Sequence, residues 1–157
     1  MTPDNATLAG YLRGARDLLA DPGRWTPEHW QTEPWRKALA RTASGLACSP
    51  HDEDAVCWSL AGAIERQMST VRCTGSMEDL RTAVSEWREK VGWARMCVSR
   101  ALADIPGDAA LIADYCTDQL GFVHIDAWAS WKTHADVLAV LDAAIRGLEL
   151  EDNYARA

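Results

Sequence analysis

The longest regular pattern in this sequence is a run of apolar residues between Ser76 and about Asp104. Its members are spaced alternately three and four positions apart: Met77, Leu80, Val84, Trp87, Val91, Ala94, Val98 and Ala101. This spacing is the heptad pattern of a helix that packs against another helix along one seam. Ser76 and Asp79 can form a capping box at its start, and Pro106 prevents it from continuing. We therefore expect one long helix at about 76–104 as the spine of the fold, with Trp87 as its central anchor.

Such a seam would be a large apolar patch unless something covered it. Three other segments have an apolar helical face, namely 6–20, 49–68 and 133–148. The second begins with Ser49, a proline and several acidic residues, which is typical of a helix start. The third begins with Thr133 as its expected cap. These helices, or a second copy of the chain, are expected to cover the seam.

The remaining segments predict short helices and connections, with no sign of a sheet. Residues 33–44 and 108–121 are expected to be helical, 122–125 to be an extended link and 128–132 to be a loop. Neither alternating strands nor a βαβ pattern is visible. The sequence therefore predicts an all-α fold: a single domain, 1–157, in which five or six helices form an irregular bundle around the long central helix. We expect residues 149–157 to form a frayed tail.

Composition limits the partners and the location of the protein. The 157 residues suit one domain, and the net charge of −7 argues against general nucleic-acid binding. No apolar run is long enough to span a membrane, and no signal peptide is visible at the N-terminus. The five cysteines are odd in number, and their spacings match no disulfide framework. We therefore expect a cytoplasmic protein that does not bind membranes.

Tryptophan is unusually frequent in this chain. There are 8 tryptophans, against 1 phenylalanine and 3 tyrosines. An indole ring either fills a core or lines a pocket for a planar or cationic ligand. Helical spacing favours core filling for several of them. Trp128 and Trp131 instead lie together in the expected late loop, so we predict that they bind a ligand or partner.

Two His-x-Asp pairs raise the question of catalysis. They are His124 with Asp126 and His134 with Asp136. Two imidazoles and a carboxylate can form an acid–base site, so one hypothesis is a small enzyme that uses His124, Asp126 and His134. Capping of the helix at Thr133 explains Asp136 without chemistry. No P-loop, dinucleotide fingerprint, zinc-protease motif or nucleophile elbow is present. Our main interpretation therefore assigns no catalytic residue.

A second polar cluster raises the question of a metal. Its members are Cys48, His51, Asp52, Asp54 and Cys57. Their order matches none of the usual zinc spacings, and the two aspartates suit the start of a helix. We therefore expect no metal site and no cofactor.

Three arginines lie one heptad apart on the predicted long helix. Arg81, Arg88 and Arg95 occupy its e positions, beside the apolar seam. Such a stripe can face an anionic partner or a second helix, and we name these residues as candidates for partner binding. The alternative is that they are ordinary flanking charges whose stems cover the seam.

Three stretches of the chain together resemble a known family. They are residues 18–25, residues 54–64, and Trp128 with residues 132–145. In this order they are similar to a family of small uncharacterised helical proteins of bacteria and phages, a domain of unknown function. Its motifs are a W-C-x-x-G-A helix and a W-N-D loop before a T-x-x-x-V-L helix. Here Cys57 precedes Trp58, and Ala129 and Ser130 replace Asn-Asp. The resemblance implies a compact helical fold and a phage association, and it implies no activity.

Two classes of function remain open at this point. The first is a non-enzymatic binding or protein-interaction protein, such as a phage or mobile-element accessory factor, which binds a protein partner or a second copy of itself. The second is a small enzyme with a His/Asp site near the Trp128–Trp131 loop. A deep polar pocket that joins His124, Asp126 and His134 would favour the enzyme, and their separation would favour the binding protein.

Overall fold

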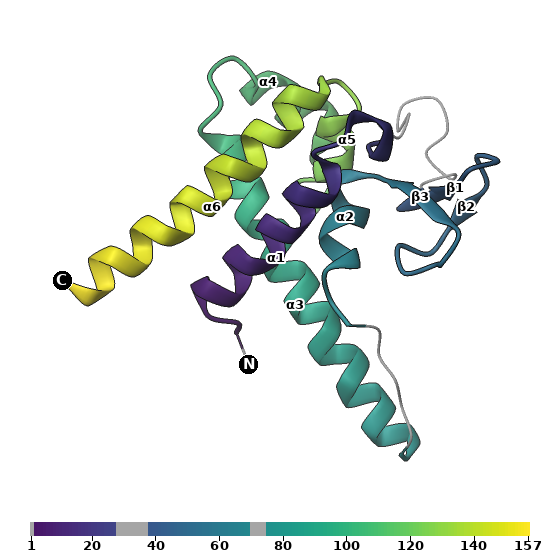
Figure 1. The fold of residues 1–157 in the computed structure, drawn as a ribbon. Coiled ribbons are helices and arrows are strands. Elements are labelled where there is room, and N and C mark those ends of the chain that lie inside the picture. Colours follow the sequence, from purple (N-terminus) through teal and green to yellow (C-terminus); the bar gives the residue numbers. More distant parts are fainter. Residues whose placement is uncertain (1, 28–37, 70–74) are drawn as a thin grey trace.

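The computed structural model describes residues 2–27, 38–69 and 75–157. Within these residues, six α-helices contribute to one core of buried apolar side chains, and a small sheet lies to one side (Figure 1). The helices are α1 (Asn5–Leu19), α2 (Leu60–Arg66), α3 (Met77–Ala103), α4 (Ala109–Leu111), α5 (Ile125–Ala129) and α6 (His134–Arg156). The strands are β1 (Ala40–Thr42), β2 (Ala47–Cys48) and β3 (Ala55–Trp58). A 3₁₀ turn at Pro22–Arg24 and a π-helical turn at Ile112–Cys116 complete the elements.

Reciprocal caps set the start of the two longest helices. At α3, the Ser76 hydroxyl accepts a hydrogen bond from the Asp79 backbone N–H at 3.2 Å. The Asp79 carboxylate in turn accepts one from the Ser76 N–H at 2.8 Å. Thr133 and Asp136 form the same pair of bonds at the start of α6. Since these bonds depend only on neighbouring residues, both helix starts were predictable, and the long helix expected at 76–104 is confirmed.

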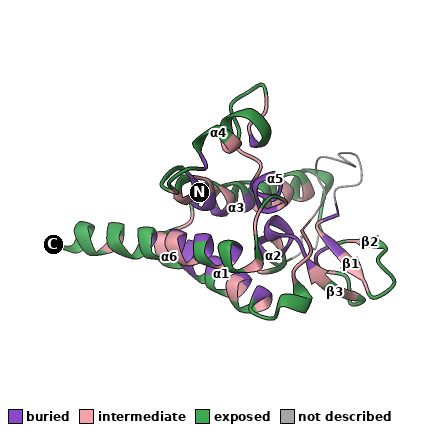
Figure 2. Ribbon diagram, turned by 90° about the horizontal axis from the view of Figure 1, so that it is seen from above, coloured by how far each residue is buried: buried purple, intermediate pink, exposed green. Residues whose placement is uncertain are grey.

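The helical core is built around α1, α3 and α6. The most extensive helix–helix contact joins α1 to α6, and α3 packs against α6 as well (Figure 2). Leu12 of α1 and Leu141 of α6 are fully buried, and Arg16 Nε donates to Asp142 Oδ1 at 2.6 Å between the two helices. The helix α6 continues to Arg156, so it includes most of the segment 149–157 for which we predicted fraying.

The small sheet corrects the all-α prediction. Its strand order is β2-β1-β3, with both pairings antiparallel, and Ala40 of β1 lies opposite Cys48 and Trp58. Its strands are two to four residues long, which is too short to give a visible alternating pattern. Residues 33–37 of the expected helix at 33–44 lie outside the described residues, and the described part of that segment contains β1.

The helix expected at 49–68 begins only at Leu60, as α2. The Asp52 carboxylate accepts the backbone N–H of Asp54 at 2.9 Å, which holds a local turn in place of a helix start. The next residues form β3, and the Trp58 indole N–H donates to the Pro50 carbonyl at 3.0 Å. The true cap of α2 is Ser59, whose hydroxyl accepts from the Gly62 N–H.

The connection between α3 and α6 also differs from the prediction. The helix expected at 108–121 is reduced to α4 and the π-helical turn, followed by a loop. Asp118 closes this loop, because its carboxylate accepts the N–H groups of Leu120 and Phe122 at 2.9 and 3.0 Å. The expected loop at 128–132 begins inside α5, so Trp128 is a helical residue.

Only the C-terminal half of α3 lies in the core. Val91, Ala94 and Val98 are buried, whereas Met77 is 68% exposed and Trp87 is half-buried. The N-terminal half of α3 projects beyond the other helices (Figure 1). The buried centre of this helix therefore lies C-terminal to Trp87, which we expected to be the central anchor.

Candidate functional site

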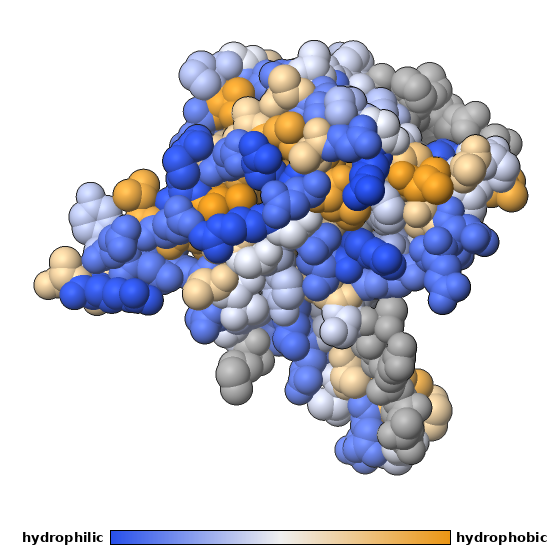
Figure 3. All heavy atoms as spheres, in the orientation of Figure 1, coloured by the Kyte–Doolittle hydropathy of each residue, from blue (hydrophilic) through white to orange (hydrophobic). Residues whose placement is uncertain are grey.

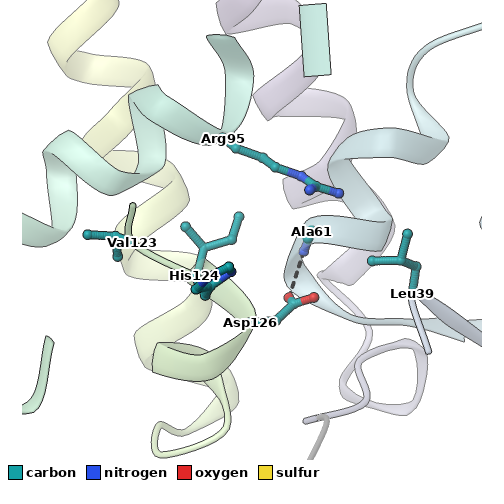
Figure 4. Close-up of a pocket in the computed structure, with 7 residues that line it drawn as sticks. Leu39, Ala61, Arg95, Val123, His124 and Asp126 are labelled. Carbon is teal, nitrogen blue, oxygen red and sulfur yellow. Dashed lines mark hydrogen bonds between the residues drawn. The ribbon is translucent and has the colours of Figure 1, made fainter. Parts of the chain in front are cut away.

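A cavity of about 330 Å³ lies where α2, α3 and the start of α5 meet (Figure 4). Its lining is partly apolar and partly charged: Leu39, Ala61, Arg95, Val123, His124, Ile125 and Asp126. The structure thus brings together Arg95, predicted to bind a partner, with His124 and Asp126, predicted for an alternative catalytic site. The cavity is therefore the place where several sequence candidates converge.

Asp126 is the acidic residue of the cavity, and α5 holds it in place. Its side chain is buried, and each carboxylate oxygen accepts a hydrogen bond from the start of α2. Oδ1 accepts from the Ala61 backbone N–H at 2.8 Å (Figure 4), and Oδ2 accepts from the Ser59 hydroxyl at 2.9 Å. These bonds tie α5 to α2 across 65 and 67 residues of sequence, and they fix the orientation of the carboxylate.

Arg95 reaches the cavity from the opposite side, on α3. One terminal nitrogen, Nη2, donates to Glu65 Oε2 at 3.0 Å, and this ion pair orients the guanidinium. The Nε atom is buried and has no hydrogen-bond partner among the described residues. Burial raises the pKa of Glu65, the charge of Arg95 opposes this effect, and the charge of Asp126 adds to it. The buried Nε therefore leaves Arg95 with a hydrogen-bonding need that α2 and α3 do not meet.

His124 forms the third polar part of the lining. Its Nε2 lies 3.2 Å from Asp118 Oδ2, and its side chain is 40% exposed. The backbone N–H of Phe122 is the main cause of the lowered pKa of Asp118, and His124 adds to the effect. His124 therefore lies at the accessible edge of the cavity, beside a carboxylate that stays ionised.

His134, the third residue of the predicted catalytic set, lies elsewhere. Its Nε2 is 2.6 Å from the Leu19 carbonyl oxygen, and its ring centroid is 5.8 Å from that of Trp25. Because a carbonyl oxygen can only accept a hydrogen bond, Nε2 must carry a hydrogen and donate that bond to Leu19. His134 thus joins the start of α6 to the end of α1. The structure brings together His124 and Asp126, and it does not bring His134 to them.

Trp128 and Trp131, both predicted to bind a ligand, have different environments. Trp128 is only 1% exposed, and its indole N–H donates to Asp108 Oδ2 at 2.9 Å. Lys132 Nζ donates to the other oxygen of Asp108 at 2.6 Å. Trp128 is therefore a core residue in this structure, and its binding role stays a prediction. Trp131 is 48% exposed and packs against Tyr115, so it remains on the surface.

We predict that Asp108 makes the protein sensitive to acid. Burial alone would raise the pKa of Asp108, but hydrogen bonds from Lys132 and Trp128 outweigh it and hold that pKa below its usual value. The stabilisation is therefore present above the unfolded pKa of about 4, and it is lost as the pH falls through the folded pKa. Asp108→Asn should reduce the loss of unfolding free energy on acidification, as measured by urea denaturation at a series of pH values. The prediction fails if the variant and the natural protein show the same acid dependence.

The arginine stripe is divided between two places. Arg95 lines the cavity, whereas Arg81 and Arg88 are exposed on the projecting half of α3. The stripe is therefore not one surface.

The polar cluster around Cys48 lies in and beside the small sheet, with Cys48 in β2 and Cys57 in β3. Among the described residues, no group of three or more His, Cys, Asp or Glu side chains is arranged to hold a metal ion. No disulfide joins the four described cysteines, Cys48, Cys57, Cys97 and Cys116. Among the described residues as a whole, no helix has the length and apolar character needed to cross a bilayer.

The fold and the cavity define a mainly helical protein with a mixed polar and apolar cavity where α2, α3 and α5 meet. The chain belongs to DUF6197, a family of unknown function, whose model matches residues 3–147. This confirms the resemblance to a family without an assigned activity. No curated protein and no solved structure is significantly similar to the chain.

Proposed function

We propose that this protein is a non-enzymatic binding protein that holds a small zwitterion, of the size of a free amino acid, in the cavity between α2, α3 and α5. One observation carries the proposal. Arg95 and Asp126 carry opposite charges and line the same cavity, yet each is paired with other groups and they form no ion pair with one another, both being described residues.

A zwitterion offers a group of opposite charge to each of the two charged side chains. A carboxylate binds an arginine side chain with strong, charge-assisted hydrogen bonds, and an ammonium group is attracted to Asp126. A simple anion would be repelled by Asp126, and a simple cation by Arg95. Apolar side chains such as Leu39, Val123 and Ile125 can pack against the body of the ligand. The volume of about 330 Å³ lies near the lower end of ligand pockets, which favours a small molecule.

The enzyme alternative has less support. Both Asp126 oxygens already accept hydrogen bonds from α2, and His134 lies at α1. Among the described residues of the lining, no serine, threonine, cysteine or lysine side chain could act as a nucleophile. Within that set His124 is in a position to transfer a proton, and an imidazole beside Asp118 does not by itself define a reaction.

Two finer parts of the proposal rest on the sequence. A cytoplasmic location is supported by the four described cysteines, which form no disulfide, as suits a reducing compartment. The acidic net charge of −7 supports the absence of general nucleic-acid binding. A role as a phage or mobile-element accessory factor rests on the resemblance alone.

The ligand class can be tested by thermal unfolding with defined compounds. A ligand that binds only the folded protein raises its melting temperature. We expect at least one free L-amino acid to raise it, and sodium acetate and methylammonium chloride at the same concentration to have no such effect. If no amino acid stabilises the protein, or if acetate alone stabilises it equally well, the zwitterion proposal is wrong.

A charge-balanced variant locates the response in the cavity. In the double variant Arg95→Gln with Glu65→Gln, the cavity loses its cation without leaving an unpaired charge, and the stabilisation by the amino acid should disappear. The double variant Arg88→Gln with Glu86→Gln removes one positive and one negative charge from the same helix outside the cavity, and should keep the response. Equal responses of the two variants would place binding elsewhere.

A further inference from the structure

The projecting half of α3, Met77–Lys90, is called the α3 arm below. The apolar seam of α3 continues along this arm without interruption, but the described residues cover it less completely there. Val91, Ala94 and Val98 are buried, whereas Leu80, Val84 and Trp87 of the arm are half-buried and Met77 is 68% exposed. Figure 3 shows the arm as the lower projection of the molecule, with hydrophobic and hydrophilic atoms side by side. The arm thus carries a helix-packing pattern that the core uses only in part.

Basic and acidic residues of the arm occupy different heptad positions. The e positions carry Arg81 and Arg88, and the g positions carry Ala83 and Lys90. The acidic residues all lie at outer positions of the heptad: Glu78, Asp79, Glu86 and Glu89. Arg81 and Arg88 are exposed, and neither forms an ion pair within the described parts of the chain. Because e and g residues set the choice of partner helix, the flanks of this seam select for negative charge.

A hollow beside the seam adds an unsatisfied donor. Trp87 lines a cavity of about 200 Å³ together with Tyr11, Met68 and Lys90. The Trp87 indole N–H is buried and lacks a hydrogen-bond partner among the described residues. A buried N–H without a partner is costly, so the described residues do not fully satisfy this part of the arm.

We propose that the α3 arm docks an amphipathic helix of a partner protein whose apolar stripe is flanked by Asp or Glu. Arm-to-arm pairing of two copies is disfavoured by charge. In an antiparallel pair the e positions face each other, which places Arg81 and Arg88 against arginines. In a parallel pair Arg88 faces Ala83, and no acidic residue of the arm lies at an e or g position to offset its charge. An acid-flanked helix meets cations on both sides of the seam and apolar residues along it.

Two designed peptides provide the direct test. Both have about three heptads with leucine at every a and d position, and they carry either glutamate or lysine at every e and g position. We expect the labelled glutamate peptide to bind the full chain in fluorescence polarisation, more weakly as salt is added, and the lysine peptide not to bind. Equal binding of the two peptides, or none by the glutamate peptide, would overturn the proposal.

Matched variants locate the binding on the arm. Arg81→Glu with Arg88→Glu should weaken binding of the glutamate peptide by about tenfold or more, because two attractions become repulsions. Arg146→Glu with Arg156→Glu makes the same change of net charge on α6 and should leave the affinity unchanged. Because both arginines of the arm are exposed, circular dichroism should show that the arm variant is folded. Equal loss in both variants, or an arm-dependent dimer of the chain in light scattering, would contradict docking of an acidic partner helix.

Discussion

Replacement of Trp128 by alanine is expected to lower the free energy of unfolding by about 3–5 kcal/mol, the usual range for emptying a buried aromatic site. Trp128 is 1% exposed and is the largest of the fully buried side chains in the described residues. Its indole N–H also donates to Asp108, so the variant would leave that buried carboxylate with one donor fewer. Chemical denaturation measures the loss directly. A loss below about 1 kcal/mol would mean that Trp128 is not part of the core.

Two further variants separate the contribution of the buried Trp128 ring from that of its hydrogen bond to Asp108. Trp131→Ala removes the same side chain three residues later, but Trp131 is half-exposed, so its loss should be below about 1 kcal/mol. Trp128→Phe keeps most of the buried ring and removes the donor to Asp108, so its cost should lie between those of the two alanine variants. Similar losses in Trp128→Ala and Trp131→Ala would instead support the predicted loop in which both residues bind a ligand.

The parts of the fold that were predictable depend on neighbouring residues. The caps at Ser76 and Thr133 each use a partner three residues away, so the sequence alone locates the starts of α3 and α6. The turn at Asp52 is also local, but its acidic residues have two physical explanations. They can favour the start of a helix through its dipole, or form a turn with their own backbone. In the structure these residues form the turn, and the strand β3 follows where the sequence predicts a helix.

The cavity depends on contacts between residues that are distant along the chain, and residue spacing alone does not reveal which of them meet. Asp126 meets Ser59 across 67 residues, and Arg95 meets Glu65 across 30. Arg95 and Asp126 could be identified as candidates from the sequence, because residue type and helical spacing can be read from neighbouring positions. Glu65 and Ser59 were missed as site residues. Ser59 lies in a segment predicted to be mid-helix, where a serine has no special meaning, and only the real start of α2 makes it a cap.

Gly62 shows how tightly the sheet and the helices meet beside the cavity. It lies in α2, within the stretch 54–64 that carried the family resemblance. A Cβ atom added at Gly62 would lie 1.8 Å from the Leu39 carbonyl oxygen and 2.6 Å from its carbon. The same carbonyl accepts the Ser59 N–H at 3.0 Å, so it is held in place by the cap of α2. Only a residue without a side chain allows this close approach.

Gly62→Ala is therefore expected to destabilise the protein by about 3 kcal/mol or more, because a backbone group has to move and overpacking cannot be relieved by a change of rotamer. Displacement of Leu39 should also weaken ligand stabilisation, since Leu39 lines the cavity. Gly92→Ala is the matched control: Gly92 is an exposed residue of α3, with no atom within 4 Å of an added Cβ. There alanine should stabilise the helix by up to about 1 kcal/mol. Urea denaturation of both variants shows whether each substitution lowers or raises the free energy of unfolding. A stabilising effect at Gly62 would show that the Leu39 backbone does not approach α2 in this way.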